Sequence, residues 1–200
     1  MADVVGICNS ALLKIGEPQI VSLSDGSKAA SDCAEQYPKL RDQELRTHLW
    51  NFAKRRAKLP RLTAAPAFGF AHQYQLPADW LRIITVHNNE AGLGGVRYSL
   101  EGRRILSDAE ALYLVYVGTV EDPNEMAADF REVLALLLAA DLAVSIASSN
   151  ALRESMLALY RRRTLQARGS DAIEDWPQPL PESSWVTARN RGHSDGRGCR

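Results

Sequence analysis

Apolar side chains recur at helical spacing at both ends of the chain, whereas the middle alternates as short strands. Residues 3–15 predict a first helix, which Gly16 ends and Pro18 prevents from continuing. A second helix is expected over about 24–50. Pro38 falls inside it and should kink or restart it, because its ring removes one helical hydrogen bond; we expect one bent helix.

The middle of the chain predicts a small antiparallel sheet, because β-branched and aromatic segments alternate there with Gly, Pro and Asn. The hairpin turn is expected at Glu101–Gly102. The last strand is apolar on both faces, which predicts a central position. The predicted strands are 70–76, 81–86, 96–100, 103–107 and 112–117.

A long helical region follows Pro123, and it is apolar nearly all round over 126–146. Such a helix is typically buried on several sides, by sister helices or by a neighbouring subunit. A further helix is expected after Asn150, with arginines on its outer face. Beyond Gly169 the composition changes, and the prolines of 176–181 favour an extended polyproline-like path.

These patterns predict an α+β fold. Helices from both ends of the chain form a bundle, a small antiparallel β-domain is inserted between them, and an extended arm closes the chain. The predicted parts are the first bundle helices (1–52), the β-rich insert (53–122), the long helices completing the bundle (123–170) and the C-terminal arm (171–200).

The charge balance and the cysteine content limit the possible functions and compartments of the protein. Lys plus Arg equals Asp plus Glu, at 24 each, so no bulk charge draws the chain to nucleic acid or to an anionic membrane. Cys8, Cys33 and Cys199 are scattered, which predicts free thiols rather than a zinc site or a disulfide framework. The first residues lack a signal-peptide pattern, and the most apolar stretch, 133–146, is too short for a membrane span. We expect a soluble protein of a reducing compartment, with no membrane partner.

No motif for catalysis or for a cofactor emerges, so the sequence predicts a non-enzymatic protein without a cofactor or metal. The histidines lie far apart in the sequence, at His48, His72, His87 and His193. Asp141 is a charged residue inside a largely apolar helical stretch, 133–146. A hydrogen-bonded or ion-paired group at a helix contact explains it better than a catalytic role does.

The basic run at 54–61 raises the question of nucleic-acid contact, because clustered cations can neutralise phosphates. Strand alternation would place these cations on both faces. A solvated or ion-paired surface is therefore the favoured interpretation. A small DNA-binding helical module that uses this run is the alternative function.

The segment from Asn9 to Leu23, together with a helix that closes on Leu49-Trp-Asn-Phe52, resembles the phage tail tubular protein A family. The rest of 4–165 is similar in layout only, and Pro38 and the C-terminal arm depart from the family pattern. The residues that carry the likeness are Ile15, Gly16, Glu17, Pro18, Trp50 and Phe52.

The resemblance implies a structural adaptor at the head–tail junction of the virion, made in the host cytoplasm. It implies a ring of twelve copies between the portal protein and the tail nozzle protein, with the β-rich part facing the tail. Double-stranded DNA would pass loosely through the lumen, and no reaction would be catalysed.

Two groups of contact residues follow from this interpretation. The arm would bind the portal through buried aromatics and prolines, and charged residues would form ion pairs with a neighbouring subunit or partner. The predicted portal-binding residues are Trp176, Pro177, Pro179, Pro181 and Trp185. The predicted ion-pair residues are Arg161, Arg162, Arg163, Glu121 and Asp122.

Overall fold

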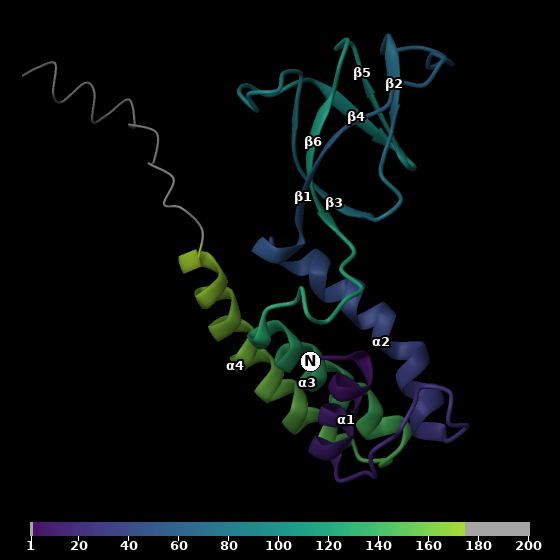
Figure 1. Ribbon diagram of the computed structural model, residues 1–200, viewed down its shortest axis with the longest axis vertical. Helices are drawn as coiled ribbons and strands as arrows, with labels where there is room; N and C mark the ends of the chain where they lie inside the picture. The colour runs from purple at the N-terminus through teal and green to yellow at the C-terminus, as the bar shows by residue number, and fades with distance from the viewer. Residues whose placement is uncertain (1, 175–200) are drawn as a thin grey trace, which may run out of the picture.

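The computed structural model describes residues 2–174 and confirms the α+β class. Helices gather at one end of the molecule and strands at the other (Figure 1). The helices are α1 (Val4–Ile15), α2 (Lys28–Thr47), α3 (Ala128–Ser145) and α4 (Asn150–Glu174). The strands are β1 (Lys54–Lys58), β2 (His72–Gln75), β3 (Trp80–His87), β4 (Tyr98–Glu101), β5 (Arg104–Ser107) and β6 (Tyr113–Gly118). All six lie between α2 and α3 in sequence, as an insert into the helical bundle.

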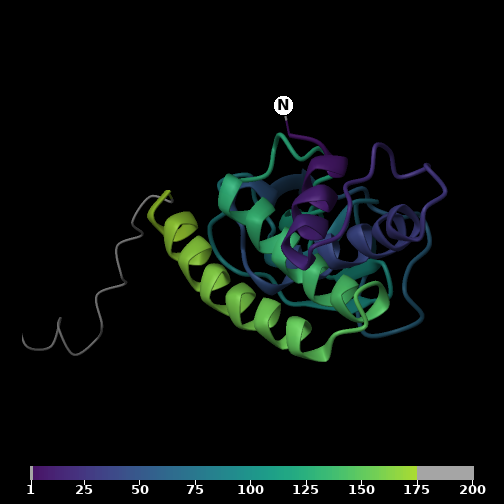
Figure 2. The same cartoon turned by 90° about the horizontal axis from the view of Figure 1, so that it is seen from below.

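Helix α3 is the centre of the bundle and packs against α1, α2 and α4 (Figure 2). Its buried side chains point to all sides, which confirms that a helix apolar nearly all round is covered by several neighbours. These side chains include Phe130, Val133, Leu134, Leu138 and Leu142.

The ends of α1 follow from local hydrogen bonding. Asp3 caps the start, because its carboxylate accepts from the amide of Gly6 at 2.6 Å. Gly16 ends the helix in the left-handed conformation with φ of 79°. The amide of Glu17 then donates to the carbonyl of Leu12 at 3.0 Å, as in a Schellman turn. The predicted helix end is confirmed.

Helix α2 differs from the prediction at its end. It runs through Pro38 as one helix, as expected, but it ends at Thr47 rather than near residue 50. Tyr37 and Leu40 are buried on either side of the proline, so core packing holds the helix where one hydrogen bond is missing. Ser27 caps the start by accepting from the amide of Ala30 at 3.1 Å.

The β part contains two three-stranded antiparallel sheets instead of one, ordered β1-β6-β3 and β2-β5-β4. The additional strand, β1, is not among the predicted strands because four of its five residues are basic. Strand β6 is central in its sheet, as predicted. The β4–β5 turn is centred one residue later than expected, on Gly102 and Arg103, since Glu101 pairs with Arg104. The two sheets enclose a core separate from that of the bundle.

Helix α4 corrects the predicted boundary of the C-terminal arm. The helix continues to Glu174, so 171–174 are helical and not extended. Gly169 interrupts neither the helix nor its packing, because Asp171, two residues later, is buried and hydrogen-bonded to the segment after α2. None of the helices within 2–174 has the length and hydropathy needed to span a bilayer.

Candidate functional site

The joint between the bundle and the β part is built around Trp50 and Phe52. These residues follow α2 and lead directly into β1. Trp50 is only 1% exposed, and its ring meets that of Phe130 edge-on with 5.1 Å between centroids. Phe52 lies 5.0 Å from the same Phe130 ring. The structure therefore brings this pair of signature residues together with α3 in the bundle core.

The other signature residues shape the turn after α1. Ile15 is buried, Gly16 provides the left-handed cap, and Glu17 and Pro18 begin the loop. The side chain of Asn9 holds the returning chain, since it donates to the carbonyl of Ile20 at 2.9 Å and accepts from its amide at 2.8 Å. The two halves of the signature thus have separate structural roles rather than forming one site.

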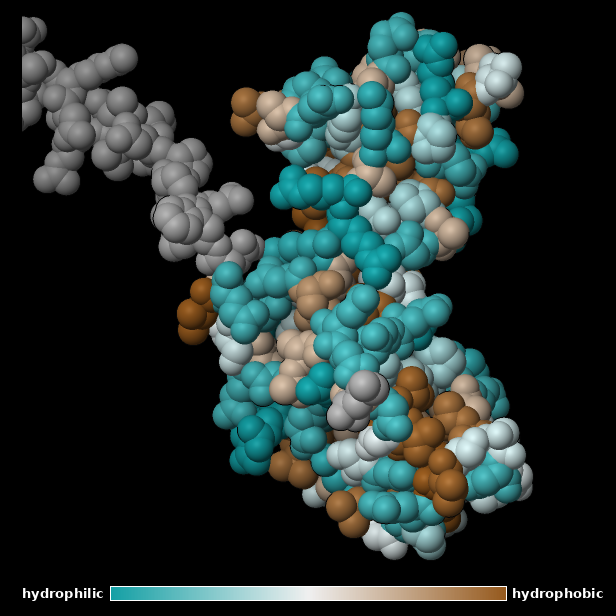
Figure 3. All heavy atoms as spheres, in the orientation of Figure 1, coloured by the Kyte–Doolittle hydropathy of each residue, from teal (hydrophilic) through white to brown (hydrophobic). Residues whose placement is uncertain are grey.

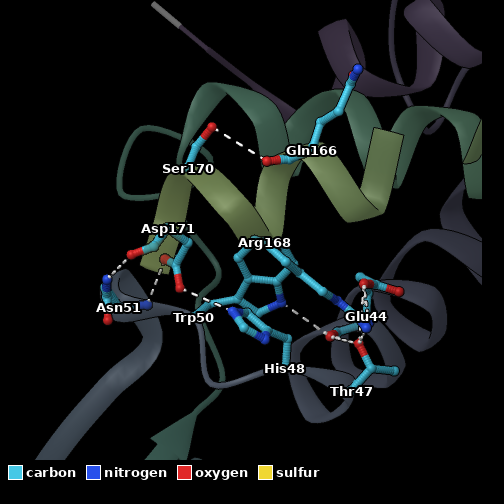
Figure 4. A network of polar contacts seen from close by, with 9 residues as sticks. All are labelled: Glu44, Thr47, His48, Trp50, Asn51, Gln166, Arg168, Ser170 and Asp171. Atoms are coloured by element: carbon cyan, nitrogen blue, oxygen red, sulfur yellow. Dashed lines mark hydrogen bonds and ion pairs between the residues drawn. The ribbon is translucent and has the colours of Figure 1, made fainter. Parts of the chain in front are cut away.

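A buried carboxylate connects α2 to α4 beside the joint (Figure 4). Glu44 is 1% exposed and accepts from the Tyr160 hydroxyl at 2.6 Å and from the Thr47 hydroxyl at 3.1 Å. Arg168 lies 3.8 Å from the same carboxylate. The Trp50 indole N–H donates to the Glu44 carbonyl at 3.3 Å. Burial, together with the hydrogen bond to Glu44 and its charge, raises the pKa of Tyr160 to about 12.

A second buried carboxylate ties the last turns of α4 to the same segment. Asp171 accepts from the backbone amide of Asn51 at 2.9 Å and lies 3.1 Å from His48 Nε2. The Asn51 side chain donates to the Asp171 carbonyl at 2.6 Å. Figure 4 shows these groups converging from α4 and from the segment that follows α2. Sequence reasoning missed both carboxylates, although Tyr160, Thr164 and Asp171 lie at helical spacing on the inner side of α4.

The His48–Asp171 pair resembles the histidine–carboxylate pairs that orient a general base. Here the edge of the imidazole meets the Trp50 ring, with 4.7 Å between centroids. The described contacts of His48 are thus to a carboxylate and to an aromatic ring that belong to the joint. This arrangement supports a role for His48 in holding α4 against the joint.

The predicted ion-pair residues lie on two exposed surfaces that do not meet within one chain. Arg161, Arg162 and Arg163 are exposed on α4, and Arg163 donates to Gln166 at 3.3 Å. Within 2–174 none of these three arginines lies within 4 Å of a carboxylate. Glu121 and Asp122 are exposed at a hollow of about 600 Å³ beside the joint. Figure 3 shows hydrophilic side chains gathered between the bundle and the β part.

Three cations of the basic run are ion-paired to carboxylates of the same chain. Arg55 lies 3.0 Å from Asp79, and Arg61 lies 3.0 Å from Glu110. Lys58 approaches Glu90 at 3.9 Å and lies 5.3 Å over the ring of Tyr113. The favoured interpretation of an ion-paired surface is confirmed for these three cations.

Asp141 is half-buried at the centre of the bundle, and burial raises its pKa while Arg153 acts in the opposite direction. Among the described residues its carboxylate has neither a hydrogen bond nor an ion pair within 4 Å, so the predicted pairing was wrong. The helical bundle tolerates it because α3 leaves this position partly open to solvent.

Cys8 and Cys33 are buried free thiols, as predicted. The part of the chain from residue 2 to 174 contains no group of three or more His, Cys, Asp or Glu side chains placed to hold a metal ion. The predicted arm residues Trp176, Pro177, Pro179, Pro181 and Trp185 lie outside the described residues, as do His193 and Cys199.

Comparisons with known proteins leave the family open. No protein-family model matches this chain, and a search of curated proteins finds no significant match.

Proposed function

We propose that this chain is a structural head-to-tail adaptor of a short-tailed bacteriophage. Twelve copies would form a ring between the portal protein and the tail nozzle protein, with DNA passing through the lumen. The observation that carries the proposal is the position of Trp50 and Phe52, one half of the signature, in the joint between the bundle and the β part. A signature at this position constrains how the two ends of an adaptor are held together.

The layout of the molecule supports the same function. The bundle and the β part have separate cores, so each end can present a surface to a different partner. The carboxylate of Glu44 ties α4 to α2, and that of Asp171 ties α4 to the segment that leads into β1. A unit with two different ends and a joint held by buried hydrogen bonds suits a protein that joins two assemblies.

The alternative, a DNA-binding module, is weaker on the same geometry. Arg55, Lys58 and Arg61 face carboxylates of their own chain, so binding to phosphate would have to break these pairs. Fluorescence anisotropy with labelled duplex DNA at low salt separates the two functions. We expect no saturable binding, and tight binding that weakens steeply with salt would favour the alternative.

The deciding experiment for the adaptor is negative-stain electron microscopy of the full chain mixed with the portal protein of the same phage. We expect an additional ring on one end of the portal, seen in class averages and in co-sedimentation. The portal of an unrelated phage serves as the control. Portals that remain bare at a large excess of this protein would overturn the proposal.

A further inference from the structure

Helix α4 has one face that no other part of the described chain covers. Its buried residues form a single stripe against α3 and the segment after α2, namely Met156, Thr164, Ala167 and Asp171. On its exposed side Leu165 and Ile173 are 72% and 85% exposed, beside the three arginines without ion pairs. This uncovered face therefore combines apolar side chains with cations that have no ion-pair partner in the described chain.

The exposed side of α4 is also shaped for close approach. Exposed residues recur at alternating spacings of four and three, and most of them are small. The residues of this stripe are Ala151, Ser155, Ala158, Arg162, Leu165, Gly169 and Ala172. A partner can therefore reach the helix backbone closely, with Arg162 inside the stripe and Glu154, Arg161 and Arg168 along one side of it.

The hollow beside the joint offers the opposite charge. Five carboxylates line it against two guanidinium groups. The Asn124 amide donates to the Asp122 carboxylate at 2.9 Å and lowers the pKa of Asp122. Glu121 and Asp122 have no cationic partner within 4 Å among the described residues. The five carboxylates are Asp42, Asp79, Glu121, Asp122 and Glu125.

These two surfaces lie on opposite sides of the bundle. Seen from below, α4 runs along one side of α3, whereas the segment that leads into α3 and carries Glu121 and Asp122 lies on the other side with α1 (Figure 2). The arginine face cannot reach the hollow of its own chain. A neighbouring copy in the same orientation can present its hollow to that face.

We infer that the outer face of α4 in one copy docks on the acidic hollow of a second copy, with Arg162 opposite Glu121 and Asp122 and with Arg161 and Arg163 on its two sides. The contact is heterologous, so repeating it joins copies head to tail. Surface ion pairs are individually weak, and the exposed Leu165 and Ile173 add apolar contact to them. Closure into a ring rests on the proposed function, whereas the pairing of these two surfaces does not.

A charge-swap experiment tests the pairing by sedimentation velocity at low salt. One variant reverses the arginines (R161E/R162E/R163E), and the other reverses the acids (E121K/D122K). The wild-type chain is expected to self-associate more strongly as concentration rises and salt falls. Each variant alone presents like charges at the contact and is expected to associate at least about tenfold more weakly. A one-to-one mixture restores opposite charges at every contact, so association is expected to return.

A matched control reverses three exposed arginines of the β part (R56E/R97E/R104E) and changes the net charge as much as the arginine variant does. It is expected to associate like the wild type. A wild-type chain that stays monomeric, or a mixture that stays dissociated, would overturn the inference. Portal docking of the wild type is measured separately, so failure of the adaptor function and failure of this interface give different results.

Discussion

At the scale of single residues, two buried carboxylates decide how α4 is held to the joint. Glu44 is surrounded by donors from Thr47, Tyr160 and Arg168, and Asp171 by donors from the segment after α2. Buried charges of this kind are stable only while their donors stay in place, because an unpaired charge in the core costs far more than an exposed one. The joint therefore depends on contacts that no sequence motif describes.

Replacing Glu44 by alanine is expected to lower the free energy of unfolding by about 2–3 kcal/mol, because the Tyr160 hydroxyl and Arg168 lose a charged partner in a buried site. Urea denaturation followed by circular dichroism measures the loss. The matched control is E35A on the same helix, which removes an exposed pair with Lys39 and should cost less than about 0.5 kcal/mol. Equal losses in the two variants would contradict the role assigned to Glu44.

The pKa of Tyr160 gives a prediction for alkaline pH. The folded-state pKa is raised to about 12, above the ordinary value of 10.0, so the stabilisation is complete below pH 10 and is lost as the pH rises toward 12. The free energy of unfolding should fall across this window, by at most about 1.4 kcal/mol per pH unit for one group. The Y160F variant should show a flatter profile, with the contribution of Tyr37, also raised to about 12, remaining. Parallel profiles would show that Tyr160 does not titrate as proposed.

At the scale of elements, most of the fold could be predicted from the sequence, since periodicity reports burial. The all-round apolar pattern of α3 and the two-faced pattern of β6 indicated their central positions, and Gly16 indicated where α1 ends. Strand β1 could not be found in this way because its residues are basic and are held by carboxylates distant in sequence. The helical end of α4 was missed for the same reason, since Asp171 pairs with a residue 120 positions away.

Gly16, which caps the end of α1, and Gly169, which lies inside α4, predict opposite effects of the same substitution. G16A is expected to destabilise the chain by about 1–2 kcal/mol, because Gly16 has a φ of 79° that disfavours any side chain. G169A is expected to stabilise it by about 0.5–1 kcal/mol, because Gly169 lies within α4 and a Cβ there meets nothing within 4 Å. Thermal unfolding of both variants measures the difference. Shifts of the same sign would contradict the cap assigned to Gly16.

At the scale of the whole molecule, the chain has no net charge, but its unpaired cations and its unpaired acids lie on different surfaces. Its net charge is zero, yet the α4 face carries unpaired arginines and the hollow beside the joint carries unpaired acids. Such a distribution leaves little long-range attraction for DNA and supports short-range contacts between copies. The composition predicted the neutrality. Only the arrangement of α4 and of the segment before α3 places the arginines and the acids on opposite sides of the bundle.

The end of α4 allows the stability of the joint to be separated from docking to the portal. A chain that ends at residue 174 keeps Asp171 and its bonds to Asn51 and His48, so its thermal midpoint should match that of the full chain. A chain that ends at residue 170 leaves the Asn51 amide without its acceptor and should lose about 2–3 kcal/mol. Thermal unfolding by circular dichroism distinguishes the two.

Portal docking should respond differently to the same truncations. The chain ending at 174 lacks Trp176 and Trp185, the predicted anchors, and should bind the portal at least about tenfold more weakly although its fold is intact. Co-sedimentation with the portal measures this loss. Docking at full strength by the chain that ends at residue 174 would contradict the role of the arm. The portal would then bind the bundle itself, through α1 to α4.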